Sequence, residues 1–241
     1  MLFAKIQKTV SVKLLLSILF LLILNTQNTA QNCSMKSVKK LIKKINETSE
    51  KGVLQDSVMK QIQSLNDLVI GYSEYNTSSR HVPVCYYLIC FSERKCMAYK
   101  YTFRSYSRPG EKFFQLDTLK LVQQTVDSVI SNAKNNKPWE IKHSEDTELG
   151  GCSHIPVEKI KGCDISDASS KTLILLTRTN HFISNFYAPE FYEYNCCPGN
   201  KDRQLFLSTI APIYSFFLSS KPSCNKAAEQ IILIFPESSR E

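Results

Sequence analysis

The sequence predicts an α+β fold in which an antiparallel sheet packs against helices, with disulfides stabilising the domain after a cleaved signal peptide. Three observations lead to this prediction. Helical and strand-like segments come in clusters joined by short turns, nine cysteines occur in 241 residues, and a basic, then apolar stretch begins the chain. A chain with 43% hydrophobic and 22% charged residues has the composition of a globular protein, which excludes wholesale disorder and collagen-like repeats.

Residues 1–30 have the pattern of a secretory signal peptide. Lysines at positions 5, 8 and 13 precede or begin the apolar run Leu14–Leu24, and Ala30 is a small residue suited to cleavage. The apolar run is shorter than the roughly 20 residues that a transmembrane helix needs, so no stable membrane span is expected. An uncleaved anchor remains the alternative, because Asn28 is not the usual small residue at that position.

Two further features point to a secreted, extracellular glycoprotein. All nine cysteines follow residue 30, as expected for a protein that folds in an oxidising compartment. Three Asn-x-Ser/Thr sequons begin at Asn32, Asn46 and Asn76, and each is a predicted glycosylation site.

The mature chain divides in our interpretation into a helical N-terminal arm, residues 31–80, and an α+β disulfide-stabilised domain, residues 81–241. The arm contains a basic amphipathic helix within residues 34–52 and a second helix over Val53–Gly71, followed by a loop. In the domain we expect a β-hairpin over Val82–Tyr106 and a helix over Leu116–Ala133. The later segments are predicted as short strands at Trp139–Lys142, Lys171–Arg178 and Ile231–Phe235, an extended aromatic segment at Phe182–Tyr194, and a helix at Leu205–Ser219.

The odd number of cysteines allows at most four bridges within the chain. Cys33 is the candidate for the unpaired thiol, which would permit a disulfide-linked dimer. A bridge between Cys90 and Cys96 would close the hairpin, Cys152 and Cys163 could close a loop, and adjacent Cys196 and Cys197 are expected to reach different partners. The disulfide candidates are therefore Cys85, Cys90, Cys96, Cys152, Cys163, Cys196, Cys197 and Cys224.

The basic charge is concentrated near the mature N-terminus. Residues 31–51 hold six lysines and two glutamates, whereas the rest of the mature chain is close to neutral. This distribution argues against nucleic-acid binding by the main domain. The helix with Lys36, Lys39, Lys40, Lys43 and Lys44 could contact anionic lipid, a heparin-like glycan or an acidic partner, or it could be a solvated face on a docked helix.

One dense polar cluster is a candidate catalytic or metal-binding loop. The candidate residues are His143, Glu145, Asp146, Glu148 and His154. The carboxylates could bind a hard cation or tune His143 as a general base, but we favour the interpretation of a solvated acidic loop, because such loops are common. The sequence contains no nucleophile elbow, zincin, P-loop or dinucleotide motif and no cysteine spacing typical of zinc sites, and no cofactor is identified.

These observations favour a binding or interaction protein with an unknown partner over an enzyme. Recognition would use the basic helix or the aromatic surface around Phe182–Tyr194. A hydrolase that uses the residue 143–154 loop is one alternative. The other is a carrier that holds a small apolar ligand between the Leu116–Ala133 helix and the sheet. The possible partners are thus an extracellular protein, a glycan or a small apolar ligand.

Overall fold

The computed structural model of the chain describes residues 31–32, 35–54, 56–76, 84–93, 95–105, 112–142, 152, 155–156, 165, 168–220 and 232–234. All of them belong to one compact unit, Gln31–Glu241. The predicted signal peptide lies outside the described residues. In the described part of the chain, no helix is long and apolar enough to cross a membrane.

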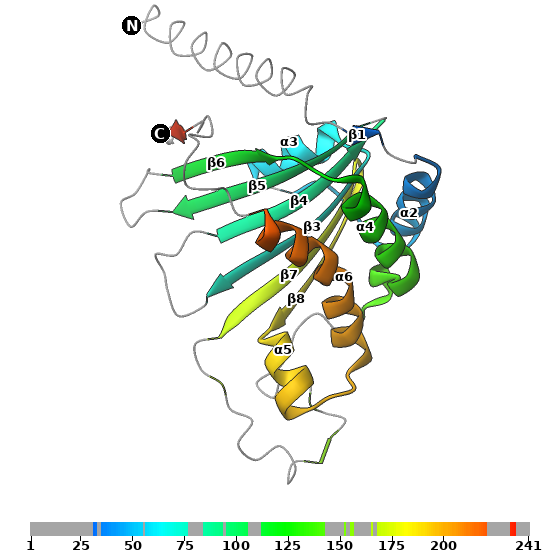
Figure 1. Cartoon of the computed structure of the whole chain (residues 1–241), viewed down its shortest axis with the longest axis vertical. Coiled ribbons are helices and arrows are strands. Elements are labelled where there is room, and N and C mark those ends of the chain that lie inside the picture. Colours follow the sequence, from blue (N-terminus) through cyan, green and yellow to red (C-terminus); the bar gives the residue numbers. More distant parts are fainter. Residues whose placement is uncertain are drawn as a thin grey trace, which may run out of the picture. The chain divides into compact units, whose positions relative to one another are not determined.

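The α+β class is confirmed, because the strands form one antiparallel sheet against which helices pack (Figure 1). The order across the sheet is β2-β8-β7-β3-β4-β5-β6-β9, with β1 paired to β5. The strands are β1 (Gln31–Asn32), β2 (Glu50–Lys51), β3 (Leu68–Asn76), β4 (Val84–Ser92), β5 (Lys95–Ser105), β6 (Lys112–Leu119), β7 (Ser169–Thr177), β8 (Asn180–Tyr187) and β9 (Ile232–Ile234).

The helical elements differ widely in length. Three of them, α2, α4 and α6, have 14, 14 and 19 residues, whereas α3 has nine. The helical elements are α2 (Met35–Thr48), α3 (Ser57–Leu65), α4 (Gln123–Asn136), the 3-10 turn η2 (Pro138–Glu140), α5 (Pro189–Phe191), the π-helical turn η4 (Tyr192–Cys196) and α6 (Lys201–Ser219).

The sheet buries apolar side chains on both faces, but the two faces are covered unequally (Figure 1). Successive residues of a strand point to opposite faces. On β3, Leu68, Ile70 and Tyr72 point to the face covered by α2, α4 and α6, which we name the three-helix face. The side chain of Val69 points to the opposite face, where Met59 and Ile62 of α3 pack, and which we name the α3 face.

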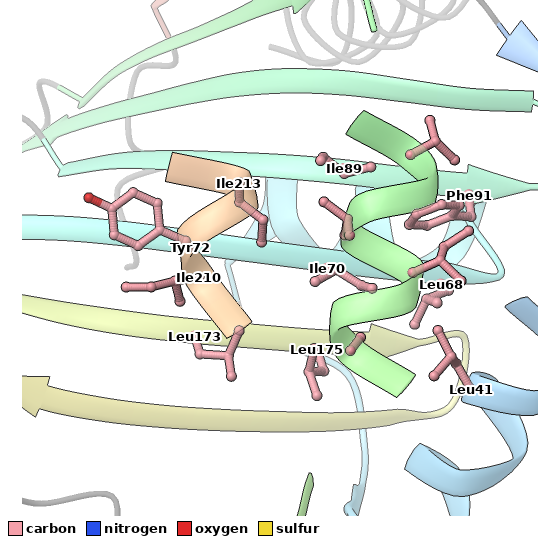
Figure 2. Close-up of a cluster of buried hydrophobic side chains, with 14 of the residues drawn as sticks. Leu41, Leu68, Ile70, Tyr72, Ile89, Phe91, Leu173, Leu175, Ile210 and Ile213 are labelled. Atoms are coloured by element: carbon pink, nitrogen blue, oxygen red, sulfur yellow. The ribbon is translucent and has the colours of Figure 1, made fainter. Parts of the chain in front are cut away.

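The three-helix face holds the larger core. Figure 2 shows α4 and α6 crossing the strands, with Ile210 and Ile213 of α6 pointing down onto the sheet. Val126, Val129 and Ala133 of α4 are each at most 2% exposed. Helix α4 is therefore packed directly against the sheet.

The predicted helix over Val53–Gly71 is only partly present. Helix α3 begins at a cap, where Asp56 Oδ1 accepts a hydrogen bond from Met59 N (2.8 Å), and it is followed by Asn66, whose Nδ2 donates to Ile62 O (2.7 Å). The chain then continues as β3, a central strand paired with both β4 and β7. The helical periodicity of residues 53–71 was misleading at its end, because pairing with β4 and with the distant strand β7 overrides local helical preference.

The boundary expected near residue 80 lies within the span of the sheet. It falls between β3 and β4, which are hydrogen-bonded neighbours in one sheet, so most of the expected arm is part of the core.

The other elements agree with the sequence in part. The hairpin over Val82–Tyr106 is confirmed as β4 and β5. Strands β7 and β9 are found where two strands were expected, and α6 is found where a helix was expected. The segment Leu116–Ala133 begins as the end of β6 and becomes helical at Gln123. The segment Trp139–Lys142 begins within a 3-10 turn, and Phe182–Tyr194 leaves the extended conformation after Tyr187.

The described disulfide joins Cys152 to Cys197, with a Cα–Cα distance of 5.4 Å. The expected bridge between Cys152 and Cys163 is therefore wrong. Cys96 and Cys196 are each disulfide-bonded as well. Because Cys197 pairs with Cys152, its neighbour Cys196 has a different partner, as expected. Cys85 and Cys90 are free thiols, which corrects the expected hairpin bridge. The register explains this result, because Cys96 lies opposite Phe91 while Cys90 lies opposite Met97. Cys33, Cys163 and Cys224 lie outside the described residues.

We predict that the variant Ile70→Ala will lower the free energy of unfolding by about 2–5 kcal/mol, because it leaves a cavity in the core of the three-helix face. The matched control is Leu218→Ala, at a side chain that is 49% exposed, for which we expect a change within about 0.5 kcal/mol. Urea unfolding followed by circular dichroism measures both, and equal losses would contradict the assignment of Ile70 to the core.

Candidate functional site: a groove on the α3 face

An open groove of about 350 Å³ lies on the α3 face of the sheet. Its lining combines the segment that leads into α3, the helix itself and four neighbouring strands. The lining residues are Leu54, Asp56, Met59, Ser73, Tyr75, Val84, Tyr86, Thr172, Ile174 and Ile183.

The groove exists because α3 is too short to cover this face of the sheet. The end of the face under α3 is filled by the cluster of Met59, Ile62 and Val69. Beyond the helix, the strands still present apolar side chains, and Ile183 on β8 is 43% exposed. Binding sites for small molecules typically measure about 300–1,000 Å³ and have apolar walls with a few polar groups, and this groove lies at the lower end of that range.

Gly71 shapes the sheet next to the groove. A Cβ at this position would lie 2.5 Å from Leu88 Cδ2, and 3.7 Å from Ile174 Cβ. The two larger side chains from β4 and β7 therefore close together over the glycine, and Ile174 forms part of the groove lining.

Asp56 is the charged group of the groove lining. The Tyr101 hydroxyl lies 3.3 Å from Asp56 Oδ2, and the Tyr101 ring stacks on Tyr86 with 5.5 Å between centroids. Burial, followed by the negative charge of Asp56, raises the pKa of Tyr86 and of Tyr101 above the ordinary value of 10. Both phenols therefore stay neutral at physiological pH, and Asp56 supplies a carboxylate beside an aromatic surface.

The predicted polar loop falls on residues that the structure does not describe. His143, Glu145, Asp146, Glu148 and His154 lie outside the described residues. Within the part of the chain that the structure describes, no group of three or more His, Cys, Asp or Glu side chains could hold a metal ion.

The aromatic segment Phe182–Tyr194 does not form one surface. Phe186 is buried on the three-helix face against Phe206, with 4.8 Å between ring centroids, while Tyr194 is 73% exposed. Of this segment, Ile183 is the residue that lines the groove. Asp56, Tyr75 and Tyr86 were not predicted as site residues, although Asp56 immediately before an apolar helical pattern is a recognisable cap signal.

The three sequons lie at different places in the fold. Asn32 belongs to β1 and Asn76 ends β3. Asn46 lies near the end of α2, where its Oδ1 accepts a hydrogen bond from Thr177 Oγ1 (2.6 Å) and so ties the helix to β7.

We compared the chain with known proteins. No protein family, curated protein or solved structure matches it.

A second groove of the same size, about 350 Å³, lies along α6 beside α5 and η4. Its carboxylates are already paired with cations of the chain. Glu190 bonds to Lys171, and Glu193 Oε2 lies 3.0 Å from Nε of the fully buried Arg203. The groove on the α3 face is consequently the stronger candidate, because its carboxylate has no such ion pair in the described structure.

Glu193 fixes the turn that carries Cys197, which gives a pH prediction. Burial alone would raise its pKa, but hydrogen bonds from Gly199 N, Gln204 and Arg203 outweigh burial and hold the pKa below its ordinary value of 4.5. A lowered pKa in the folded state stabilises the fold above the unfolded value, and this contribution disappears as the pH falls through the folded value.

We expect Glu193→Gln to be less stable than the wild type at pH 7, by about 3 kcal/mol, because Arg203 loses its buried counter-charge. The difference should shrink as the pH falls below 4.5, since the wild-type carboxyl also becomes neutral. Thermal unfolding from pH 3 to pH 7 measures this, with the exposed Glu140→Gln as the control. A difference that stays constant with pH would contradict the assignment.

Proposed function

We propose that this chain is a secreted protein that binds a small amphipathic molecule, with an apolar or aromatic body and a basic group, in the groove on the α3 face. The observation that carries the proposal is the groove itself, an apolar sheet surface with one carboxylate at its side. Secretion is supported by the pattern of residues 1–30, the sequons and the Cys152–Cys197 disulfide.

The lining suggests how such a ligand would be held. Val84, Ile174 and Ile183 offer an apolar floor, and the face of Tyr86 can stack on a ring. A protonated amine would gain from the Asp56 carboxylate and from the electron-rich faces of the tyrosines. This charge preference separates the proposed ligand from a fatty acid, whose carboxylate Asp56 would repel.

Asp56 has two separate tasks in this proposal. Its carboxylate caps α3 through Met59 N, and a carboxylate oxygen can accept further hydrogen bonds. Asparagine is an equally good N-cap, so Asp56→Asn removes the charge while it keeps the helix start.

The probes that test the proposal are two fluorescent dansyl compounds, the cationic dansylcadaverine and the anionic dansyl-aminohexanoate. We predict that Ile183→Arg weakens dansylcadaverine binding at least tenfold, because a long cationic side chain then occupies the groove. Val122→Arg, at a side chain that is 47% exposed and outside the groove, is the matched control and should bind as the wild type does.

The charge of Asp56 is tested separately with the same two probes. We expect Asp56→Asn to weaken dansylcadaverine binding about fivefold, the scale of one partly exposed charge pair, without weakening the anionic probe. Fluorescence titration measures both affinities. Unchanged binding in Ile183→Arg, or an equal loss in Val122→Arg, would contradict the proposed site.

A further inference from the structure

A row of exposed lysines lies along α2, away from the groove. Lys36, Lys39, Lys40, Lys43 and Lys44 are all exposed, whereas Val38, Leu41 and Ile45 of the same helix are at most 3% exposed. At 100° per residue, the five lysines fall within an arc of about 140° opposite the buried stripe. We name this surface the lysine row.

The lysine row has little counter-charge of its own. Lys44 Nζ lies 2.9 Å from Glu47 Oε2. Within the described part of the chain, the other four lysines of the row form no ion pair. Both side chains of the pair are exposed to solvent, so it contributes little to stability. Several like charges held together on one surface create a positive potential that attracts an anionic partner.

The opposite side of the helix packs against the sheet. Val38, Leu41 and Ile45 pack into the core of the three-helix face, and Asn46 bonds to Thr177 on β7. An amphipathic helix that binds a bilayer must insert its apolar side into the lipid. In α2 that side is already buried against the sheet, which argues against a membrane surface as the partner.

The lysine row has the geometry of a linear polyanion's binding site. Neighbours three and four residues apart have Cβ atoms about 5–6 Å from each other, and the row extends about 12 Å from Lys36 to Lys44. The helix contains no aromatic residue on which a base could stack, so nucleic acid is disfavoured. We propose that the lysine row binds a sulfated glycan, independently of the groove on the α3 face.

The test is affinity for heparin, measured with the full secreted protein. The first variant replaces Lys39, Lys40, Lys43 and Lys44 with glutamine, which removes four charges and keeps side-chain length and helix propensity. The matched control replaces Lys60, Lys120, Lys134 and Lys201, four exposed lysines elsewhere, in the same way. Circular dichroism and unfolding midpoints establish that both variants fold.

We expect the α2 variant to bind heparin at least tenfold more weakly than the wild type at 0.15 M salt and to elute earlier in a salt gradient. The control variant should stay within twofold of the wild type, and desulfated heparin should not be retained. An equal shift of both variants, or none, would overturn the proposal, as would binding to phosphatidylserine vesicles or RNA without binding to heparin.

Discussion

The pairing of β3 with both β4 and β7 is the interaction on which the rest of the structure depends. It places Ile70 between Ile89 and Leu175. The next residue towards the start of β3, Val69, lies between Cys90 and Leu176. The alternation of the strand then assigns each side chain to one of two faces, and both faces are apolar at the centre of the sheet. The helices therefore have to cover the sheet from two sides, which they do unequally.

This unequal cover gives the chain its two candidate binding surfaces. Three longer helices cover one face, and α3, with nine residues, covers only part of the other and leaves the groove beside it. On the covered face, α2 uses its apolar stripe for packing, so its lysines face solvent. The groove is suited to an amphipathic small molecule and the lysine row to a polyanion, and neither surface needs the other.

The sequence predicted those elements whose local pattern agrees with their place in the fold. The β4–β5 hairpin, α2 and α6 carry patterns that suit both. Strand β3 was missed, because Gly71 resembled a helix end while the strand is specified by partners far away in the sequence. The Cys90–Cys96 bridge was wrong for a similar reason, since a shift of one position in the hairpin register decides which side chains lie opposite each other.

The groove could not be predicted from the sequence, because its lining comes from segments up to about 130 residues apart, between Leu54 and Ile183. No short motif records such an arrangement, and each lining residue alone is typical of a sheet surface. What the sequence could have indicated is Asp56, a helix cap beside an apolar run.

A crystal structure of the protein soaked with dansylcadaverine tests the central claim most directly. The account predicts that the probe lies in the groove, with its ring system against Tyr86 and Ile183 and its amine toward the Asp56 carboxylate. A probe bound elsewhere on the protein, with the groove on the α3 face empty, would contradict it.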